Sequence, residues 1–447
     1  MVEENKWYEQ QESRGGLLRT EEELRQALER DPHDARAWVE LGIVLRNTGQ
    51  LGEAETMCRQ AVELAPDQPW SHYNLAMVLE QLGRSAEAEA AYRRTVELAP
   101  DNKWAQRGLA YLLMELGRSA EAEASLRKVI ELTPDDAAAY NNLGMLLGQA
   151  GHCTEAEAML RKAIALNPEH AYAYNNLANV LLDMQREQEA EEALRKALEL
   201  EPGYAEAYHN LGNVLRLTGR DAEAETAYRK ATELMPDKAL PHLQLGLLLA
   251  MTGRTAEAEA SWRKAIELQP NLREAHHNLG ILLWQLGRRE EAEAALRKAI
   301  ELAPDSAQAH YSLAMFLSDA KRMDEAEAAL RKVIQLRPDD PAAYRALGDL
   351  LLEVRRLDEA ERIYLAALAL DPQDAHVHYN LGWLLVGLGR TAEAEASWRK
   401  AIQFAPDDSN AYYNLGMLLR QLGREEESQA MLRKAQELTL RDAQANS

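Results

Sequence analysis

The chain has 447 residues and a formal net charge of −22 at pH 7. A surface this acidic repels phosphate groups, so the composition argues against nucleic-acid binding and against docking on anionic membranes. No apolar run approaches the roughly 18 residues that span a bilayer, and the N-terminus lacks a signal peptide's basic and apolar regions. Two cysteines cannot form a disulfide framework, and we therefore expect a cytoplasmic protein with no membrane insertion.

Prolines recur along the chain at a constant spacing of 34 residues. They are Pro32, Pro66, Pro100, Pro134, Pro168, Pro202, Pro236, Pro270, Pro304, Pro338, Pro372 and Pro406. Such self-similarity is the signature of a repeat protein, stabilised between neighbouring repeats and without one central core. We predict twelve tandem repeats over residues 35–442, forming a single domain. Residues 1–34 are predicted to form a degenerate half-repeat that caps the array, and residues 443–447 a short tail.

The repeat over residues 137–170 shows what each unit encodes. Tyr140, Leu143 and Leu147 are spaced by three and four residues, which is typical of an amphipathic helix. Gly151 then permits a turn, and a second amphipathic segment follows until Pro168, which cannot continue a helix. Each repeat is therefore predicted to be a helix, a turn and a second helix.

Repeat positions are counted here from residues 35, 69, 103 and so on. Position 8 is Gly or Ala in all twelve repeats, and position 20 is Ala in eleven, with Ser428 in the last. Small residues at both positions would let the paired helices approach closely. The first repeat also has large Trp38 at position 4, Leu41 at position 7, Ala61 at position 27 and Pro66 at position 32.

This pattern resembles the tetratricopeptide repeat (TPR), and it recurs in register over about nine-tenths of the chain. The resemblance implies an all-α solenoid in which antiparallel helix pairs stack into a right-handed superhelix. In such a superhelix the first helices line the concave face and the second helices the convex face. Position 15 departs from the pattern, because Gln185, Lys321 and Arg355 replace glycine there. A left-handed conformation would cost these side chains about 1 kcal/mol each. In the last repeat Leu440 replaces proline, and the second helix is more polar, as expected of a cap.

Several residue types that often carry chemistry have a structural interpretation here. Five histidines occupy position 4, where other repeats have Trp or Tyr, and we interpret them as packing residues: His72, His242, His276, His310 and His378. Cys58 is expected to be buried and inert, and Cys153 exposed in a turn. No metal-ligand, redox or phosphate-binding motif is present. We therefore predict no enzyme activity, no cofactor and no metal site.

Second helices carry acidic residues four positions before basic ones, as in Glu89 and Arg93, Glu123 and Arg127, and Glu157 and Arg161. Such pairs add about 0.2–0.5 kcal/mol each to a helix. They indicate a solvated convex face rather than a binding patch.

Asparagine is frequent at position 6 of the first helices, in seven of twelve repeats. The position-6 residues are Asn74, Asn142, Asn176, Asn210, Asn278, Asn380 and Asn414, and Asn141, Asn175, Asn179 and Asn213 lie nearby. Asparagine costs a helix about 0.5 kcal/mol relative to alanine, but its amide offers donors and an acceptor to a peptide backbone. The array resembles the asparagines of the superhelical repeats in O-linked N-acetylglucosamine transferases, which grip the main chain of substrates. The alternative is that these amides bond the neighbouring repeat and fix its register.

Aromatic residues flank the asparagines and are predicted to line the same groove. Toward the N-terminus they are Trp70, Tyr73, Trp104 and Tyr111, and toward the C-terminus Trp284, Tyr311, Tyr379, Trp383 and Tyr413. Exposed Trp and Tyr favour interface hot spots because they bury large areas with little loss of side-chain freedom.

These features predict a non-enzymatic scaffold that binds an extended peptide segment of a partner protein in its concave groove. Asparagines would hold the peptide backbone, and the aromatic residues would hold its side chains. Two alternatives remain. The array could be the sensing or substrate-recruiting arm of an enzyme, resembling those of glycosyltransferases or proteases, acting in trans or on a longer chain. It could also be a structural protein that forms homo-oligomers through its ends.

Overall fold

The computed structural model describes residues 19–445, with side chains to Arg441. Residues 1–18 of the predicted N-terminal cap and residues 446–447 of the predicted tail lie outside the described residues. The described part contains 25 helices and no strand, so the predicted all-α solenoid is confirmed. It falls into two compact units, the first ending at Pro236 and the second beginning at Asp237.

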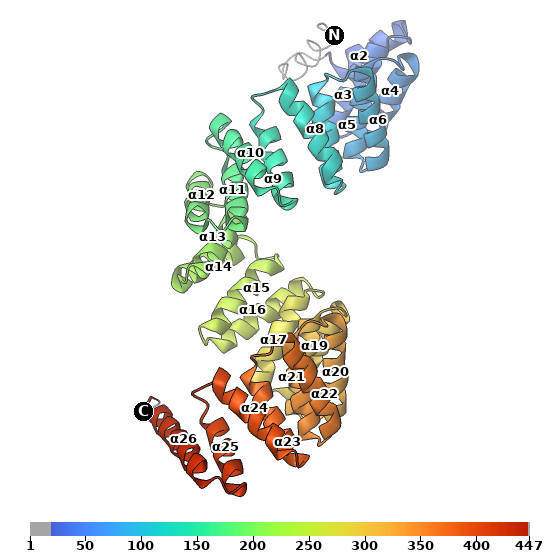
Figure 1. Ribbon diagram of the computed structural model, residues 1–447. Helices are drawn as coiled ribbons and strands as arrows, with labels where there is room; N and C mark the ends of the chain where they lie inside the picture. The colour runs from blue at the N-terminus through green and yellow to red at the C-terminus, as the bar shows by residue number, and fades with distance from the viewer. Residues whose placement is uncertain (1–18, 446–447) are drawn as a thin grey trace. The chain divides into compact units, whose positions relative to one another are not determined.

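The first unit begins with α2 (Glu21–Arg30), which is followed by six helix pairs (Figure 1). Its first helices are α3 (Ala35–Asn47), α5 (Pro69–Gln81), α7 (Lys103–Glu115), α9 (Ala137–Gln149), α11 (Ala171–Asp183) and α13 (Ala205–Leu217). Its second helices are α4 (Leu51–Leu64), α6 (Ser85–Leu98), α8 (Ser119–Leu132), α10 (Cys153–Leu166), α12 (Glu187–Leu200) and α14 (Asp221–Leu234). Each second helix packs against its own first helix and against the first helix of the next repeat within the unit.

The second unit repeats this arrangement with six more pairs. Its first helices are α15 (Ala239–Met251), α17 (Arg273–Gln285), α19 (Ala307–Asp319), α21 (Pro341–Glu353), α23 (Ala375–Gly387) and α25 (Ser409–Gln421). Its second helices are α16 (Thr255–Leu268), α18 (Arg289–Leu302), α20 (Met323–Leu336), α22 (Leu357–Leu370), α24 (Thr391–Phe404) and α26 (Glu425–Ala445). The last helix has 21 residues whereas the other second helices have 14. Leu440 stands where proline would otherwise end it.

The small residue at position 8 is required by close helix approach, as the sequence indicates. A Cβ atom added to Gly212 would lie 2.5 Å from Cε1 of Tyr228, which is fully buried. At Gly144 the added atom would lie 2.6 Å from Cγ of Leu160. The residue at position 24 therefore fills the space that the missing side chain leaves.

The turns between paired helices have the expected left-handed residue at position 15. Gln185, Lys321 and Arg355, which replace glycine there, have φ values of 58°, 61° and 60°. These three turns therefore keep the left-handed conformation that glycine adopts in the other repeats, which is strained for a residue with a side chain. The strain is tolerated because the surrounding helices determine the path of the turn.

In several repeats the position-4 side chain bonds the end of the preceding repeat. A ring nitrogen of His72, His276, His310 or His378 lies 2.8–3.0 Å from the carbonyl oxygen of the proline six residues earlier. Tyr344 donates its hydroxyl hydrogen to the equivalent carbonyl at 3.1 Å. His378 is buried and the other three histidines are half-buried, in agreement with the predicted packing role, and each ring also bonds the carbonyl oxygen of the proline that follows the preceding second helix.

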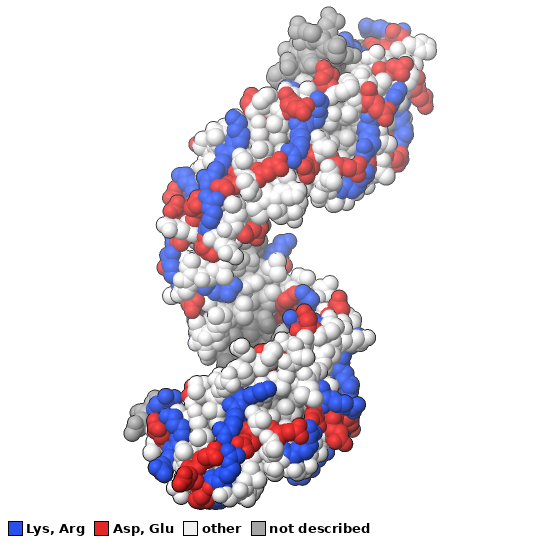
Figure 2. Space-filling view, viewed as in Figure 1, with Lys and Arg blue, Asp and Glu red and all other residues white. Residues whose placement is uncertain are grey.

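Second helices are joined by four-residue ion rings, each made of two glutamates and two arginines from adjacent repeats. In one ring Arg93 bonds Glu89 at 2.8 Å and Glu121 at 2.6 Å, and Arg118 bonds the same two carboxylates at 2.6 Å each. The predicted pairs four residues apart form one side of each ring. The first unit in Figure 2 carries these side chains as alternating blue and red bands.

Three junctions within the units lack one arginine of the ring. Gln50 and His152 stand at position 16, and Leu365 stands at position 25. The remaining arginine at each junction still bonds both carboxylates, as Arg127 does with Glu123 at 2.8 Å and Glu155 at 2.7 Å.

Candidate peptide-binding surface

Neighbouring first helices of the first unit are joined by asparagine side chains. Nδ2 of Asn176 donates to Oδ1 of Asn141 at 3.0 Å, and Nδ2 of Asn210 donates to Oδ1 of Asn175 at 2.9 Å. Asn141 also donates to Oδ1 of Asn142 at 3.1 Å. We call these five residues the amide ladder. The ladder links position 6 of one repeat to position 5 of the repeat before it, so it fixes the register of the stack.

The amide ladder keeps some hydrogen-bonding capacity. An asparagine amide carries two N–H hydrogens and an oxygen with two lone pairs. Asn176 and Asn210 each use one hydrogen in the ladder and are half-buried, whereas the acceptors Asn141 and Asn175 are buried. The alternative in which the asparagines fix the register of the repeats therefore accounts for one hydrogen bond each of Asn176 and Asn210. The remaining N–H and oxygen of each donor are the groups that could contact a peptide.

The most accessible side chains beside the ladder are Tyr172 and Asn179, both on α11. Tyr172 is 51 % exposed, and Asn179 is exposed with no side-chain hydrogen bond to a described residue. Seven residues apart on one helix, they lie on the same face. The ring of Tyr172 rests on that of Tyr204, with centroids 4.7 Å apart. Tyr172 was missed in the sequence, although it shares position 2 with the flagged Trp70 and Trp104. Asn213, by contrast, accepts the hydroxyl hydrogen of Tyr228 at 2.8 Å.

The N-terminal aromatic residues lie deeper than the sequence suggested. Trp70 and Trp104 are buried together with Val39 and Ile43, so their indoles are core residues. Asn74 is also buried and donates to the carbonyl oxygen of Trp70 in its own helix at 2.8 Å. We expected Trp70, Trp104 and Asn74 to face a partner, but all three side chains are buried within the repeats.

Two further N-terminal tyrosines are only half-buried. Tyr73 meets the ring of Tyr92 edge-on, with centroids 6.0 Å apart. Burial raises the pKa of the half-buried Tyr111 hydroxyl. Both rings keep part of their surface accessible.

The second unit presents an aromatic cluster made of Tyr379, Trp383 and Tyr413. Trp383 is 48 % exposed and Tyr413 is 53 % exposed, on the adjacent first helices α23 and α25. Nε1 of Trp383 donates to the hydroxyl of Tyr379 at 3.1 Å, and Nδ2 of Asn414 donates to the same oxygen at 2.9 Å. Behind Trp383 the ring of buried Trp398 stands edge-on at 6.0 Å. These contacts hold the half-exposed indole of Trp383 in one orientation, and Tyr413 adds an exposed ring on the neighbouring first helix.

A polar network joins α21, α22 and α23. Asn380 and Tyr364 donate to Oδ1 of Asp349 at 2.7 Å each, and Nε2 of His376 lies 3.1 Å from Oδ2 of the same carboxylate. The hydrogen bond to Asp349 raises the pKa of His376. The amide of Asn380 is therefore engaged within the protein, as is that of Asn414.

The other predicted residues of the second unit are spread over α17 and α19. Trp284 is half-buried and donates to Oδ2 of Asp319 at 3.2 Å, and Tyr311 packs on the cluster that includes Val333. Asn278 is half-buried and makes no side-chain hydrogen bond to a described residue. Close by, a ring nitrogen of His277 lies 2.9 Å from Oγ of Ser312, which reproduces the ladder geometry with other side chains.

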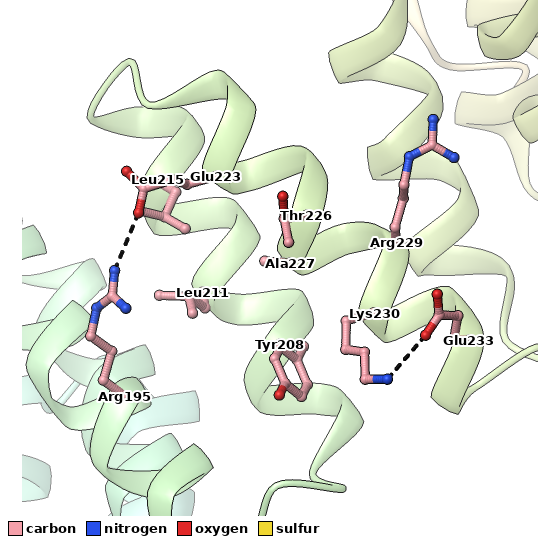
Figure 3. Close-up of a pocket in the computed structure, with 10 residues that line it drawn as sticks. All are labelled: Arg195, Tyr208, Leu211, Leu215, Glu223, Thr226, Ala227, Arg229, Lys230 and Glu233. Atoms are coloured by element: carbon pink, nitrogen blue, oxygen red, sulfur yellow. Dashed lines mark hydrogen bonds and ion pairs between the residues drawn. The ribbon is translucent and has the colours of Figure 1, made fainter.

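Clefts are also present between the second helices. One of about 530 Å³ in the first unit is edged by ion pairs between Arg195 and Glu223 and between Lys230 and Glu233 (Figure 3). Its remaining lining residues are Tyr208, Leu211, Leu215, Thr226, Ala227 and Arg229. None of the residues of the amide ladder or of the aromatic cluster lines this cleft, although α13 contributes to both the cleft and the ladder.

The two thiols differ in their burial. Cys58 is fully buried, and burial raises its pKa to about 12, as an inert thiol requires. Cys153, expected to be exposed, is half-buried. Within residues 19–441, histidine, cysteine, aspartate and glutamate side chains form no group of three that could hold a metal ion. None of the described helices combines the length and the apolar character needed to cross a membrane.

Family models cover most of the chain. Models of the tetratricopeptide repeat match residues 33–101, 73–137, 141–205 and 409–441. A model of the C-terminal domain of cilia and flagella-associated protein 70 matches residues 203–414. A comparison with curated proteins finds no match.

Solved structures of repeat proteins are similar to parts of the chain. YrrB, described as a TPR protein with an unusual peptide-binding site, is 23 % identical, with 42 % of this chain and 98 % of that chain covered and a TM-score of 0.40. MamA is 29 % identical, with coverages of 36 % and 95 % and a TM-score of 0.35. A tetratricopeptide repeat protein from Parabacteroides merdae is 19 % identical, with coverages of 56 % and 98 % and a TM-score of 0.47.

Proposed function

Because the chain is a tetratricopeptide-repeat protein, we propose that it is a non-enzymatic scaffold that binds an extended peptide segment of a partner protein. The peptide would lie on the first helices of one unit. Proteins of this fold are typically interaction scaffolds, and the resemblance of the asparagine array to that of the glycosyltransferases motivates the peptide-binding form of the proposal.

The exposure of Trp383 and Tyr413 carries the proposal. Large aromatic side chains that remain half-exposed on adjacent helices, with one indole fixed by a hydrogen bond, are the features of an interface anchor. Because Tyr379 and Trp398 already hold Trp383 in place, a partner would lose little side-chain entropy on binding it. A ring edge or an aliphatic side chain of the partner fits this surface.

In the first unit the equivalent role falls to Tyr172 and Asn179. Tyr172 would take a partner side chain, and Asn179 would bond the peptide main chain. Asn176 and Asn210 would contribute the N–H that the ladder does not use. A main chain held this way is read without regard to its sequence, so side-chain preference would come from the aromatic residues.

The experiment is a selection of peptides from a random display library on the full chain, followed by affinity measurements with variants. For peptides that bind the second unit, Trp383→Ala and Tyr413→Ala should each weaken binding by about 10-fold or more. For peptides that bind the first unit, Tyr172→Ala and Asn179→Ala should do so. Leu422→Ala, which truncates an exposed side chain outside this surface, is the matched control. Unchanged affinity in all four variants would reject the proposal.

Asn179 is a better probe than the asparagines of the ladder. Replacing Asn176 or Asn210 by alanine would leave a buried amide oxygen without its donor and loosen the repeat register. A loss of binding in those variants would therefore not distinguish recognition from folding. Asn179 has no such structural bond.

The two alternative functions predict different results. A substrate-recruiting arm of an enzyme would bind segments that the enzyme modifies, and adding the array in trans would raise the reaction rate. A self-assembling scaffold would show a mass that rises with concentration in analytical ultracentrifugation. A constant monomer mass together with peptide binding supports the scaffold proposal.

A further inference from the structure

One second helix differs from all the others on its outer surface. Position 25 is Arg in the second helix of eleven repeats and Leu365 in α22. Position 26, basic in nearly all the other second helices, is Ala366. Between Arg362 and Asp371 there is no charged residue. The array therefore has a single uncharged stretch where its other second helices carry charge.

The uncharged stretch faces solvent. Leu365 is 52 % exposed and Leu370 is 43 % exposed, Ala369 is exposed and Ala366 is half-buried. These four side chains are spaced by one and four residues, so they share one face of the helix. We call them the apolar strip of α22. In a protein with 28 % charged residues, such a strip is unexpected on a surface that other repeats cover with ion pairs.

The same substitution leaves the adjacent carboxylates with one arginine. Arg390 alone bonds Glu361 at 2.7 Å and Glu393 at 2.7 Å. At the next junction Glu427 is bonded by Arg399 at 3.1 Å and by Arg424 at 2.7 Å. The side chain of Glu393 is 59 % exposed, compared with 50 % for Glu427. The apolar strip is therefore bordered by a carboxylate that could accept a second cation.

The repeat architecture shows which surface the strip borders. Between α16 and α18 the same repeat positions line a cleft of about 490 Å³, where Arg263 and Glu267 occupy positions 25 and 29. In α22 those positions are Leu365 and Ala369. The α22 side of this junction is thus apolar where the equivalent cleft is charged.

We propose that this face of α22 and α24 docks an amphipathic helix of a partner protein that carries apolar side chains and one basic residue. The apolar side chains pack on the apolar strip, and the guanidinium or ammonium group occupies the missing corner of the ion ring, beside Glu393. The charge of the site selects the basic partner, because an acidic residue there would face two carboxylates with one arginine between them. This surface lies on second helices and does not depend on the proposed peptide-binding surface.

Fluorescence anisotropy with a defined probe tests this docking site. The probe is a fluorescein-labelled, alanine-based helical peptide with two leucines one turn apart and one arginine on the same face. A second probe has glutamine in place of the arginine. The full chain should bind the arginine probe about fivefold more tightly than the glutamine probe, and added salt should remove that difference.

Leu365→Arg is the decisive variant, because it restores the residue that the other second helices carry. It should keep the helical circular dichroism spectrum and weaken binding of the arginine probe by about 10-fold, since it removes the apolar contact and fills the ring. Arg399→Leu is the matched control, because it removes the equivalent arginine from the ion ring between α24 and α26. Lys400 remains beside the new leucine, where α22 has Ala366, so this variant should not gain a comparable binding site. Equal binding of the two probes, no binding at all, or unchanged binding in Leu365→Arg would overturn the proposal. A concentration-dependent mass that Leu365→Arg abolishes would also overturn it, by assigning the strip to a second copy of the chain.

Discussion

Replacing Gly382 by alanine tests how tightly the aromatic cluster is held. A Cβ atom at Gly382 would lie 2.5 Å from Nε1 and 2.6 Å from Cδ1 of Trp398. That indole is 3 % exposed, donates to the carbonyl oxygen of Tyr379 at 3.1 Å, and meets Trp383 edge-on. It therefore cannot move without losing a hydrogen bond and the support of Trp383.

The matched variant is Gly144→Ala. Its Cβ would lie 2.6 Å from Cγ of Leu160, but a leucine can accommodate alanine at this position. Ala178 faces Leu194 at the same repeat positions, and both are fully buried. No repeat of this chain combines alanine at position 8 with tryptophan at position 24. The two variants thus make the same chemical change against a flexible and a rigid neighbour.

The expected magnitudes follow from opposing contributions. Glycine to alanine within a helix stabilises by about 1 kcal/mol, overpacking costs about 1–3 kcal/mol, and the lost indole hydrogen bond costs about 1 kcal/mol. Gly382→Ala should therefore lower the local free energy of opening by about 1–3 kcal/mol. Gly144→Ala should be neutral or stabilise by up to about 1 kcal/mol.

Native-state hydrogen exchange measures these effects locally, which matters because a repeat array need not unfold in one step. Protection should fall in α23 and α24 for Gly382→Ala, and it should stay unchanged or rise in α9 and α10 for Gly144→Ala. Adding Trp398→Leu to Gly382→Ala should recover most of the loss. Equal or higher protection in Gly382→Ala alone would refute the packing argument.

Four further predictions concern the turns, the ion rings and the thiols. Gln185→Gly should increase the free energy of unfolding by about 1 kcal/mol, because glycine adopts the left-handed conformation of this turn without strain. The urea midpoint should therefore rise, and a lower midpoint would show that Gln185 is not strained. His152→Arg should complete an ion ring and stabilise by up to about 1 kcal/mol, and the gain should vanish near about 1 M salt in the same assay. The arginines of the ion rings lower the pKa of glutamates such as Glu189. The ion rings therefore stabilise the fold above the unfolded glutamate pKa of about 4.3, and this stabilisation is lost progressively as the pH falls below that value. The urea midpoint should fall between pH 7 and pH 3, and it should fall less in high salt. Thiol-reagent kinetics should show Cys153 reacting in the native protein and Cys58 only after unfolding; fast labelling of both would contradict the burial of Cys58.

Most of the fold could be predicted from the sequence because each repeat carries its own signals. Residues such as Gly144, Gly151 and Pro168 determine where helices approach, turn and end, and these are local or nearly local effects. Of each ion ring, only the pair within one helix could be predicted from the sequence. Arg93 and Glu89 are four residues apart and their pairing follows from helix geometry, whereas Arg118 reaches Glu89 only because adjacent repeats stack at a particular angle.

The candidate site was harder to predict, because exposure depends on neighbouring repeats. Trp70 and Trp383 are both aromatic residues on first helices, but Trp70 packs with Val39 and Ile43 while Trp383 remains half-exposed. The two indoles occupy different repeat positions, 2 and 9, but Tyr172 shares position 2 with Trp70 and is 51 % exposed, so repeat position alone does not decide exposure. Only the side chains that the adjacent helices place nearby decide whether an indole becomes core or surface.

Three of the seven position-6 asparagines, Asn176, Asn210 and Asn414, donate to the position-5 residue of the repeat before them. In different repeats the position-6 donor Asn210 meets Asn175 and the donor Asn414 meets Tyr379, so the donor is kept while the acceptor changes. A residue that serves the stack in this way is poorly suited to distinguish one partner from another, because altering it also alters the register. Partner specificity should therefore lie at exposed side chains such as Tyr172 and Trp383, which make no side-chain hydrogen bond to a described residue of the neighbouring repeat and can vary without loosening the stack.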